Sequence, residues 1–227
     1  MLYFQAMHRR PFLQKISLIS TGILTLPFAS YGQVTVPKAT RLKFITASDG
    51  HWGQPNTDFE GSHRQLIDAI HREKGVDFVV FNGDLIHDMP SFLPEVKTVY
   101  DQVQFPTFAT RGNHDRVDAE TFARVMGHAT NHSFVVKDDY GVVLLDSSNL
   151  AGDYLCADLN YLKGILDSYQ QLSHVFVFIH ISQLDWARNG VACQEFMDLI
   201  ASYKNVRATF HGHDHDLDGL MVYRTKP

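Results

Sequence analysis

The sequence feature that most limits the possible folds is a series of short apolar runs, each followed by side chains suited to metal ligation. The clearest run is Phe78–Asp88, with the sequence FVVFNGDLIHD. An unbroken apolar run that stops at a turn is typical of a parallel strand buried on both faces. Gly83 permits a sharp turn, so Asp84 is expected at the carboxyl end of the strand, where α/β sheets bind ligands.

Four further apolar runs end in side chains of the same kind. The segments at their ends are Asp49-Gly50-His51, Gly112-Asn113-His114-Asp115, His180 and Gly212-His213-Asp214-His215. A single Gly-Asp pair carries little information, because turns commonly use both residues. Their recurrence along the chain indicates one shared site, in which Asp84 is interpreted as a carboxylate bridging two metal ions.

The residue types in these segments narrow the choice of metal. Asp, His and Asn suit Zn²⁺, Mn²⁺ or Fe, and the lack of cysteine ligands argues against a closed structural zinc site. His213 and His215 are one residue apart, so their side chains point to opposite sides of an extended segment and can reach different ions. Two ions about 3.5–4 Å apart would hold a bridging hydroxide, the nucleophile of a two-metal hydrolase.

The rest of the chain alternates strands and helices. Helices are expected over residues 58–74, 94–103, 118–126, 158–169 and 194–202, and further strands over 42–47, 105–110, 175–179, 206–210 and 219–224. Residues 133–136 and 142–145 flank a turn and predict a β-hairpin. This alternation indicates an α/β fold with parallel units, to which the hairpin adds antiparallel strands.

The first forty residues are expected to lie outside this domain. Residues 1–6, MLYFQA, are interpreted as the remnant of an expression tag, and residues 33–40 as a linker into a domain at 41–227. Residues 7–32 combine a basic start, an apolar stretch and small residues, which predicts an export signal and a periplasmic protein. Arg9-Arg10 resembles a twin-arginine signal. An ordinary secretory leader and an uncleaved anchor are the alternatives, although the apolar stretch is shorter than the span of about 20 residues that a membrane requires.

Charge and cysteine content bear on partners and compartment. A formal net charge of −5 gives no sign of the basic surface that nucleic-acid-binding proteins carry. Cys156 and Cys193 could form one disulfide in an exported protein, or remain two buried thiols. Oligomeric state is left open by the sequence.

The five segments, taken in order, resemble the motifs of the calcineurin-like metallophosphoesterase family. That pattern is Asp-x-His, Gly-Asp, Gly-Asn-His-Asp/Glu, His and Gly-His-x-His, and it runs here from Asp49 to His215. The resemblance implies a four-layer αββα sandwich. It also implies two ligand sets, one of Asp49, His51, Asp84 and His215, and one of Asp84, Asn113, His180 and His213.

The same resemblance implies an activity, the hydrolysis of a small phosphate ester. A metal-bridging hydroxide would attack phosphorus and His114 would protonate the leaving oxygen, so the residues expected to act in catalysis are His114, Asp84 and Asp115. A phosphodiesterase acting on cyclic nucleotides or lipid head groups is the runner-up. A non-catalytic domain that binds metal or phosphate is the alternative from another class.

The chain departs from the family pattern in two places. Many members have an Asp three residues after the bridging Asp, where it orients the histidine of Gly-Asn-His. That position is His87 here, which leaves Asp88 or Asp115 as the partner of His114. The family also continues for further strands beyond Gly-His-x-His, so the chain is interpreted as either truncated or short.

Other polar residues have simpler interpretations. Arg111, Arg116 and Arg188 could each hold a phosphate oxygen, although a solvated surface arginine is the better expectation. His63 and His71 fall on a predicted helix and are expected to be solvated.

Overall fold

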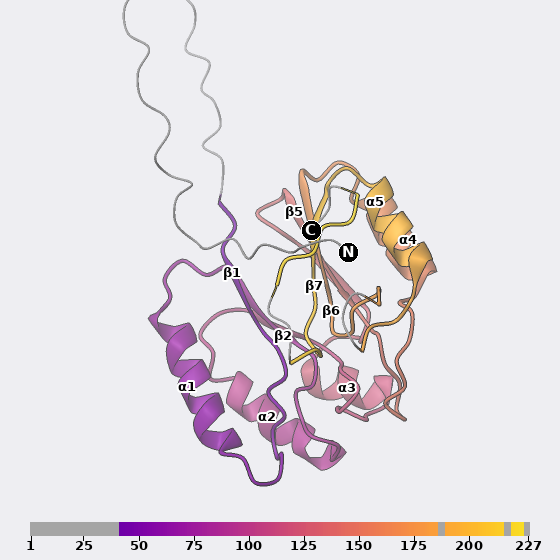
Figure 1. Cartoon of the computed structure of the whole chain (residues 1–227). Helices are drawn as coiled ribbons and strands as arrows, with labels where there is room; N and C mark the ends of the chain where they lie inside the picture. Colours follow the sequence, from indigo (N-terminus) through magenta and orange to yellow (C-terminus); the bar gives the residue numbers. More distant parts are fainter. Residues whose placement is uncertain (1–40, 186–188, 216–218, 225–227) are drawn as a thin grey trace, which may run out of the picture. The chain divides into compact units, whose positions relative to one another are not determined.

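The computed structural model describes residues 41–185, 189–215 and 219–224 (Figure 1). The predicted tag, export signal and linker fall on residues 1–40 and lie outside the described residues. No helix among the described residues is long and apolar enough to span a membrane.

The described strands form two sheets. The first has the order β1-β2-β3 and is parallel throughout; its strands are β1 (Phe44–Ala47), β2 (Phe78–Asn82) and β3 (Thr107–Thr110). The second has the order β4-β5-β6-β7; its strands are β4 (His132–Val136), β5 (Tyr140–Leu145), β6 (His174–Ile179) and β7 (Val206–Phe210). β4 and β5 pair antiparallel, which confirms the hairpin, whereas β5, β6 and β7 pair parallel. The strand expected over residues 219–224 does not form.

Helices follow the strands in the alternation that the sequence predicts. They are α1 (Phe59–Arg72), a short 3-10 turn η1 (Pro90–Phe92), α2 (Leu93–Tyr100), α3 (Ala119–Met126), α4 (Leu159–Ser168) and α5 (Gln194–Ser202). An aspartate caps three of them. Asp58 accepts from the amide of Gly61, Asp118 from that of Thr121, and Asp158 from those of Asn160 and Tyr161. Such caps satisfy amides that have no partner inside the first helical turn.

Alternating side chains of the strands divide the core into three layers. In β2, Val79 and Phe81 pack with residues of α1, α2 and α3, whereas Phe78 and Val80 pack against β5 and β6. The other faces of β5 and β6 pack against α4 and α5. The order is therefore helices, sheet, sheet, helices, the predicted αββα sandwich; Figure 1 shows α4 and α5 together, away from α1 and α2.

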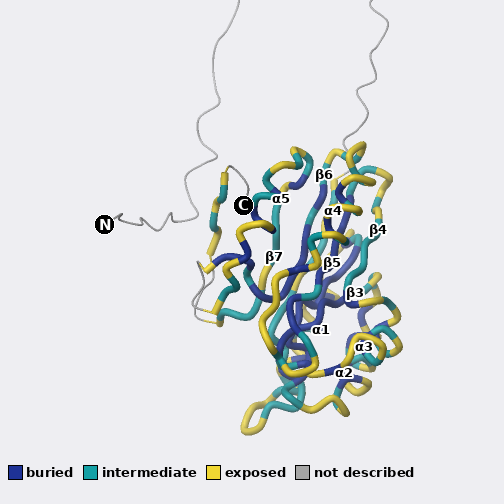
Figure 2. The backbone as a smooth tube through the Cα atoms, turned by 90° about the vertical axis from the view of Figure 1, so that its right-hand side faces the viewer, coloured by how far each residue is buried: buried dark blue, intermediate teal, exposed yellow. Residues whose placement is uncertain are grey.

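The burial of both faces explains why the central strands are apolar without interruption. All five residues of β2 are buried, and in β5 the run from Gly141 to Leu145 is buried as well. Figure 2 shows the buried segments concentrated in the strands and the exposed ones in loops and outer helix faces. Hydrophobic burial along these strands leaves their polar ends as the place where charged side chains gather.

Candidate metal centre

The buried amide of Asn82 joins strand ends of both sheets. Its Oδ1 accepts from Thr110 Oγ1 at 2.9 Å, which links β2 to β3. Its Nδ2 donates to the carbonyls of Phe210 at 3.1 Å and Ile179 at 3.5 Å, at the ends of β7 and β6. This role could not be predicted from the sequence, because an Asn before Gly is an ordinary turn residue. Asn82 therefore holds together the edge at which the predicted ligands lie.

The predicted ligands form two groups at this edge. The ligand atoms of Asp49, His51 and His215 lie within 4.8 Å of one another, and so do those of Asp84, His180 and His213. The two groups correspond to the two ligand sets that the family resemblance implies.

Asp84 belongs to the second group and also approaches the first. Its Oδ2 is 3.2 Å from Nε2 of His180 in one group and 3.8 Å from Nε2 of His51 in the other. Its Oδ1 accepts from the amide of His114 at 2.8 Å. Burial opposes ionisation of this carboxyl, but the close approach of His180 and the His114 amide outweigh burial and lower the pKa of Asp84 to about 2. Asp84 is thus a carboxylate with one oxygen directed at both groups.

Several buried polar atoms of these residues fit metal ligation. Asn113 Oδ1 and both ring nitrogens of His213 are buried without a hydrogen-bond partner in the described part of the chain. A buried polar atom without a partner is costly, so each such atom needs an explanation. Ligation accounts for Asn113 Oδ1 and for one ring nitrogen of His213, because oxygen and imidazole nitrogen are ligand atoms that Zn²⁺, Mn²⁺ and Fe accept.

His180 shows how the fold prepares a ligand. Its Nδ1 lies 2.8 Å from the carbonyl oxygen of Asn82, an acceptor only, so Nδ1 carries a proton and Nε2 is the nitrogen directed at Asp84, where a metal would take the place of its proton. Its side chain is fully buried. Burial of His51 lowers its pKa to about 4, so this ring is also neutral and able to ligate.

Glycines of the motifs allow the chain segments to approach this closely. A Cβ added at Gly112 would lie 2.2 Å from both the amide nitrogen and Oδ1 of Asp84. A Cβ at Gly83, where φ is +83°, would lie 2.4 Å from the ring of His180. The motifs therefore need glycine to bring the segments around Asp84 together.

Asp115 has a different place from the one expected. It is fully buried; Oδ1 accepts from the amides of Leu85 and Ile86, and Oδ2 accepts from the amide of Gly112. These bonds hold the turn after Asp84 against the turn after β3. Because its oxygens are occupied by backbone amides, the expectation that Asp115 acts in the reaction or orients His114 is corrected, and its role is to fix these turns.

Asp88 is the carboxylate that meets His114. His114 Nδ1 lies 3.0 Å from Asp88 Oδ1, and Arg116 Nε lies 2.8 Å from the same oxygen. His87 stacks on the ring of His114 with centroids 4.9 Å apart and planes at 10°. The position that is Asp in many family members is therefore a ring here, and the carboxylate comes from the next residue.

Two arginines and two histidines that the sequence analysis singled out remain to be placed. Arg111 is buried and its guanidinium pairs with both oxygens of Asp146, so the expectation of a solvated surface arginine was wrong at this position. Arg188 lies outside the described residues. His63 is buried, with Nδ1 at 2.7 Å from the carbonyl of Phe59, so the expectation of a solvated ring was wrong; His71 is exposed.

Tyr154 lies beside the site and was missed by the sequence reasoning. Its ring packs edge-on against His213 at 4.7 Å, and it is 44% exposed. Two residues later, Cys156 forms a disulfide with Cys193, which ties this loop to the start of α5. Of the two alternatives that the sequence left open for the cysteines, the structure has the disulfide. A lone tyrosine in a loop has no pattern by which sequence could have placed it.

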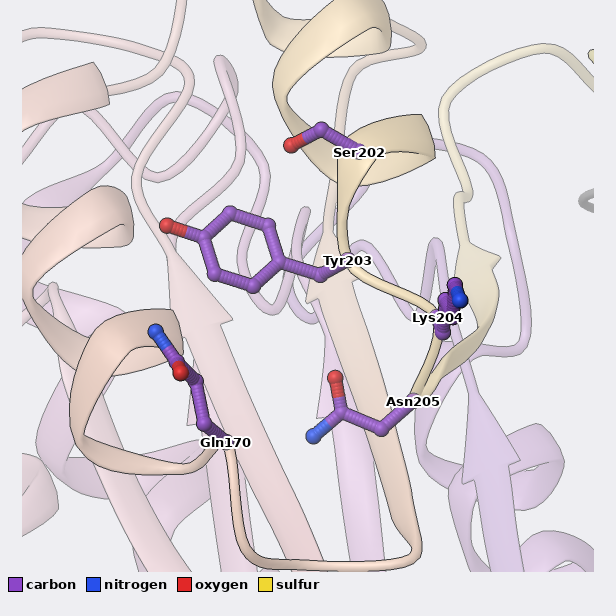
Figure 3. A pocket seen from close by; sticks show the side chains of 5 residues that line it. All are labelled: Gln170, Ser202, Tyr203, Lys204 and Asn205. Carbon is purple, nitrogen blue, oxygen red and sulfur yellow. The ribbon is translucent and has the colours of Figure 1, made fainter.

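A surface hollow of about 370 Å³ lies elsewhere and has no part in this site. It is lined by residues at the ends of α4 and α5 and before β7, namely Gln170, Ser202, Tyr203, Lys204 and Asn205 (Figure 3). These residues precede the strands, whereas the ligands follow them. The hollow therefore lies at the opposite ends of the strands from the candidate metal centre.

Comparison with solved structures shows the same fold. A dimetal phosphatase from Danio rerio is 16% identical, with a TM-score of 0.64 over 77% of this chain and 82% of that one. A purple acid phosphatase from yellow lupin (Lupinus luteus) seeds is 15% identical, with a TM-score of 0.53 over 76% of this chain and 37% of its own. The NAD nucleotidase of Haemophilus influenzae is 14% identical, with a TM-score of 0.51 over 79% of this chain and 39% of its own. The chain thus spans less than half the length of the last two.

Sequence comparison identifies the family. No curated protein matches the chain at a significant level. The family model described as calcineurin-like phosphoesterase matches residues 42–217, which include every predicted ligand. The chain therefore belongs to the calcineurin-like phosphoesterase family, whose members are hydrolases.

Proposed function

We propose that this protein hydrolyses a small phosphate ester at a dinuclear metal centre, with His114 as the general acid. The observation that carries the proposal is the position of Asp84, whose Oδ2 lies 3.2 Å from His180 and 3.8 Å from His51. A single carboxylate oxygen shared by two groups of metal-binding side chains is the arrangement that a two-ion site requires.

Each ion would have its own ligands. Asp49, His51 and His215 with Asp84 would hold one ion, and Asn113, His180 and His213 with Asp84 would hold the other. The chemistry that two such ions supply when bound is activation of water as the nucleophile and neutralisation of charge on the phosphoryl oxygens. Asn113 and His213 support this assignment, because the amide oxygen of the first and the ring nitrogens of the second are buried with no hydrogen-bond partner among the described residues.

The contacts of His114 support its assignment as the general acid. Its backbone amide donates to Asp84, so the residue is anchored to the bridging carboxylate. Its Nδ1 faces Asp88, so the proton on Nδ1 is held there and Nε2 is the nitrogen that can transfer a proton to the leaving oxygen. Its side chain is 32% exposed, which leaves it accessible to a substrate. A domain that only bound metal or phosphate would have no use for this oriented histidine.

We also propose that the protein is exported and works in the periplasm. The apolar segment within residues 7–32 is the basis of this proposal, and the disulfide between Cys156 and Cys193 supports it. Disulfides persist in oxidising compartments and are rare in the cytosol.

A substrate screen tests the proposed activity. Purified protein would be assayed against nitrophenyl phosphate, alkyl phosphates, bis(nitrophenyl) phosphate and cyclic nucleotides, with Mn²⁺, Zn²⁺ and Fe²⁺ added separately. Hydrolysis of monoesters by wild type and none by Asp84→Ala is the expected result. Hydrolysis of the diesters alone would assign the phosphodiesterase alternative. Tight binding of two ions without hydrolysis of any substrate would contradict the catalytic function.

A further inference from the structure

His87 contacts both a candidate metal ligand and the candidate general acid. Its Nδ1 lies 3.3 Å from Nδ1 of His51, and its ring stacks on that of His114 at 4.9 Å. Its Nε2 lies 3.8 Å from Asp88 Oδ2, and its side chain is 24% exposed. No role in the proposed reaction has so far required this residue.

The backbone fixes the position of His87 relative to His51. The amide of His51 donates to the carbonyl of Asp84 at 2.9 Å, and the amide of Trp52 donates to that of Leu85 at 2.9 Å. The amide of His87 donates back to the carbonyl of Trp52 at 3.0 Å. These bonds form a short parallel ladder between the two motif segments. The main chain therefore holds the two segments that carry the rings of His51 and His87 side by side, and the rings meet at 3.3 Å.

If His51 ligates a metal through Nε2, the contact between the two rings has one consistent pattern of protons. The Nε2 of His51 faces Asp84 and lies 3.3 Å from Nε2 of His215, so this nitrogen presents the lone pair to a metal. A neutral His51 then carries its proton on Nδ1, which must donate to an acceptor. The nearest such atom is Nδ1 of His87, which accepts only if the proton of His87 is on Nε2, on the side of Asp88.

We propose that His87 is a positioning residue with two separate contacts. Through Nδ1 it accepts from His51 and fixes the tautomer and orientation of that ligand. Through its ring face it restrains His114 in the orientation set by Asp88. This inference rests on the proposed dinuclear site.

Three substitutions separate the two contacts. His87→Asn keeps an acceptor close to the place of Nδ1 but removes the ring. His87→Gln carries the same amide one methylene further, so its oxygen is displaced from that place. His87→Phe keeps a ring to stack on His114 but has no acceptor. His71→Asn, at an exposed position on α1, is the matched control for loss of a histidine.

The first measurement is metal affinity, determined by titration of chelator-treated protein with Mn²⁺ or Zn²⁺ in a calorimeter. Loss of a partner that orients a ligand typically lowers metal affinity about 10–100-fold. We expect that loss for one ion of the two in the Gln and Phe variants, and near-wild-type affinity in the Asn variant and the control. Unfolding curves of all variants show whether each is folded, and the Asn and Gln pair suffices if the Phe variant is not.

The second measurement is the ratio of kcat on an alkyl phosphate to kcat on nitrophenyl phosphate, at saturating metal. His87→Phe should keep the wild-type ratio, and His87→Asn should lower it, because only the first keeps the stack on His114. Wild-type affinity for both ions in folded Gln and Phe variants would overturn the proposal. Fewer than two ions bound by wild type would instead overturn the proposed function, and the inference with it.

Discussion

His114 Nδ1 and Asp88 Oδ1 lie 3.0 Å apart, and this contact connects the candidate general acid to a partly exposed carboxylate. Arg116 lies against the same carboxylate oxygen, so Asp88 is itself held in place. The backbone adds a further link, because the amide of Asp88 donates to the carbonyl of His114 at 2.9 Å. The pair is therefore fixed by side chains and main chain together.

Replacing Asp88 by Asn should reduce proton delivery without removing metal. The side-chain amide of Asn can still contact the ring of His114. Because this amide can donate as well as accept, it no longer selects the form of the ring that carries a proton on Nδ1. We expect about a 10–100-fold loss of kcat on alkyl phosphates, the range typical of a lost outer-shell partner, and a smaller loss on nitrophenyl phosphate. Metal content should be unchanged. Asp68→Asn, at an exposed position on α1, is the control for the lost charge. A loss of bound metal in Asp88→Asn would contradict this role.

Replacing His114 by Ala should separate acid catalysis from metal binding. A positioned general acid contributes about 10²–10⁴-fold, and most when the leaving oxygen is basic. His114→Ala should therefore keep its ions and lose far more activity on alkyl phosphates than on nitrophenyl phosphate. Asn113→Ala should weaken one ion and lower both activities together. Equal losses on the two substrates in His114→Ala, with metal intact, would mean that His114 steadies the phosphoryl oxygens and does not donate a proton.

Replacing Gly112 by Ala should disrupt the centre, although it adds only one methyl group. The new Cβ would lie 2.2 Å from the backbone nitrogen of Asp84, which cannot move without displacing the bridging carboxylate. We expect loss of bound metal and a lower free energy of unfolding. Gly164→Ala is the matched control, because this residue lies in α4 with open space around it. That change should stabilise the protein by about 0.5–1 kcal/mol. Denaturant unfolding and metal analysis check both variants, and normal metal content in Gly112→Ala would refute the expected clash.

The sequence predicted most of the strands and helices where the signal is local. The apolar run before Asp84 specifies a strand buried on both faces, and the motif residues follow strands whose ends meet at one edge. The sequence could not choose between Asp88 and Asp115 as the partner of His114. The partner depends on how the turns after β2 and β3 pack together. In the structure, the carboxylate of Asp115 accepts hydrogen bonds from the amides of Leu85, Ile86 and Gly112.

Long-range contacts account for the remaining differences. Arg111 could be read as a phosphate ligand until Asp146, from the end of β5, is seen to occupy its guanidinium. His63 lies on a helix at a position that could face solvent, but packing against Trp52 and Tyr100 buries it. Asn82 joins four strand ends only because the two sheets meet there. None of these contacts has a signature in the neighbouring sequence.

The export proposal makes its own prediction. Mature protein recovered from the periplasm should begin near Gln33, as read by N-terminal sequencing or mass spectrometry. If the twin-arginine interpretation of Arg9-Arg10 is right, the double change Arg9→Lys, Arg10→Lys should sharply reduce export. Unchanged export of the double variant would assign the general secretory route. Full-length protein retained in the cytoplasm would contradict export altogether.

The most direct test of the dinuclear centre is the number of ions per chain at which activity saturates. Chelator-treated protein would be titrated with Mn²⁺ or Zn²⁺, and bound metal and phosphatase activity would be measured on the same samples. We predict that activity rises until two ions are bound per chain, and that Asp84→Ala binds neither ion tightly, because both groups of ligands share this carboxylate. Full activity with one ion bound per chain would contradict the account.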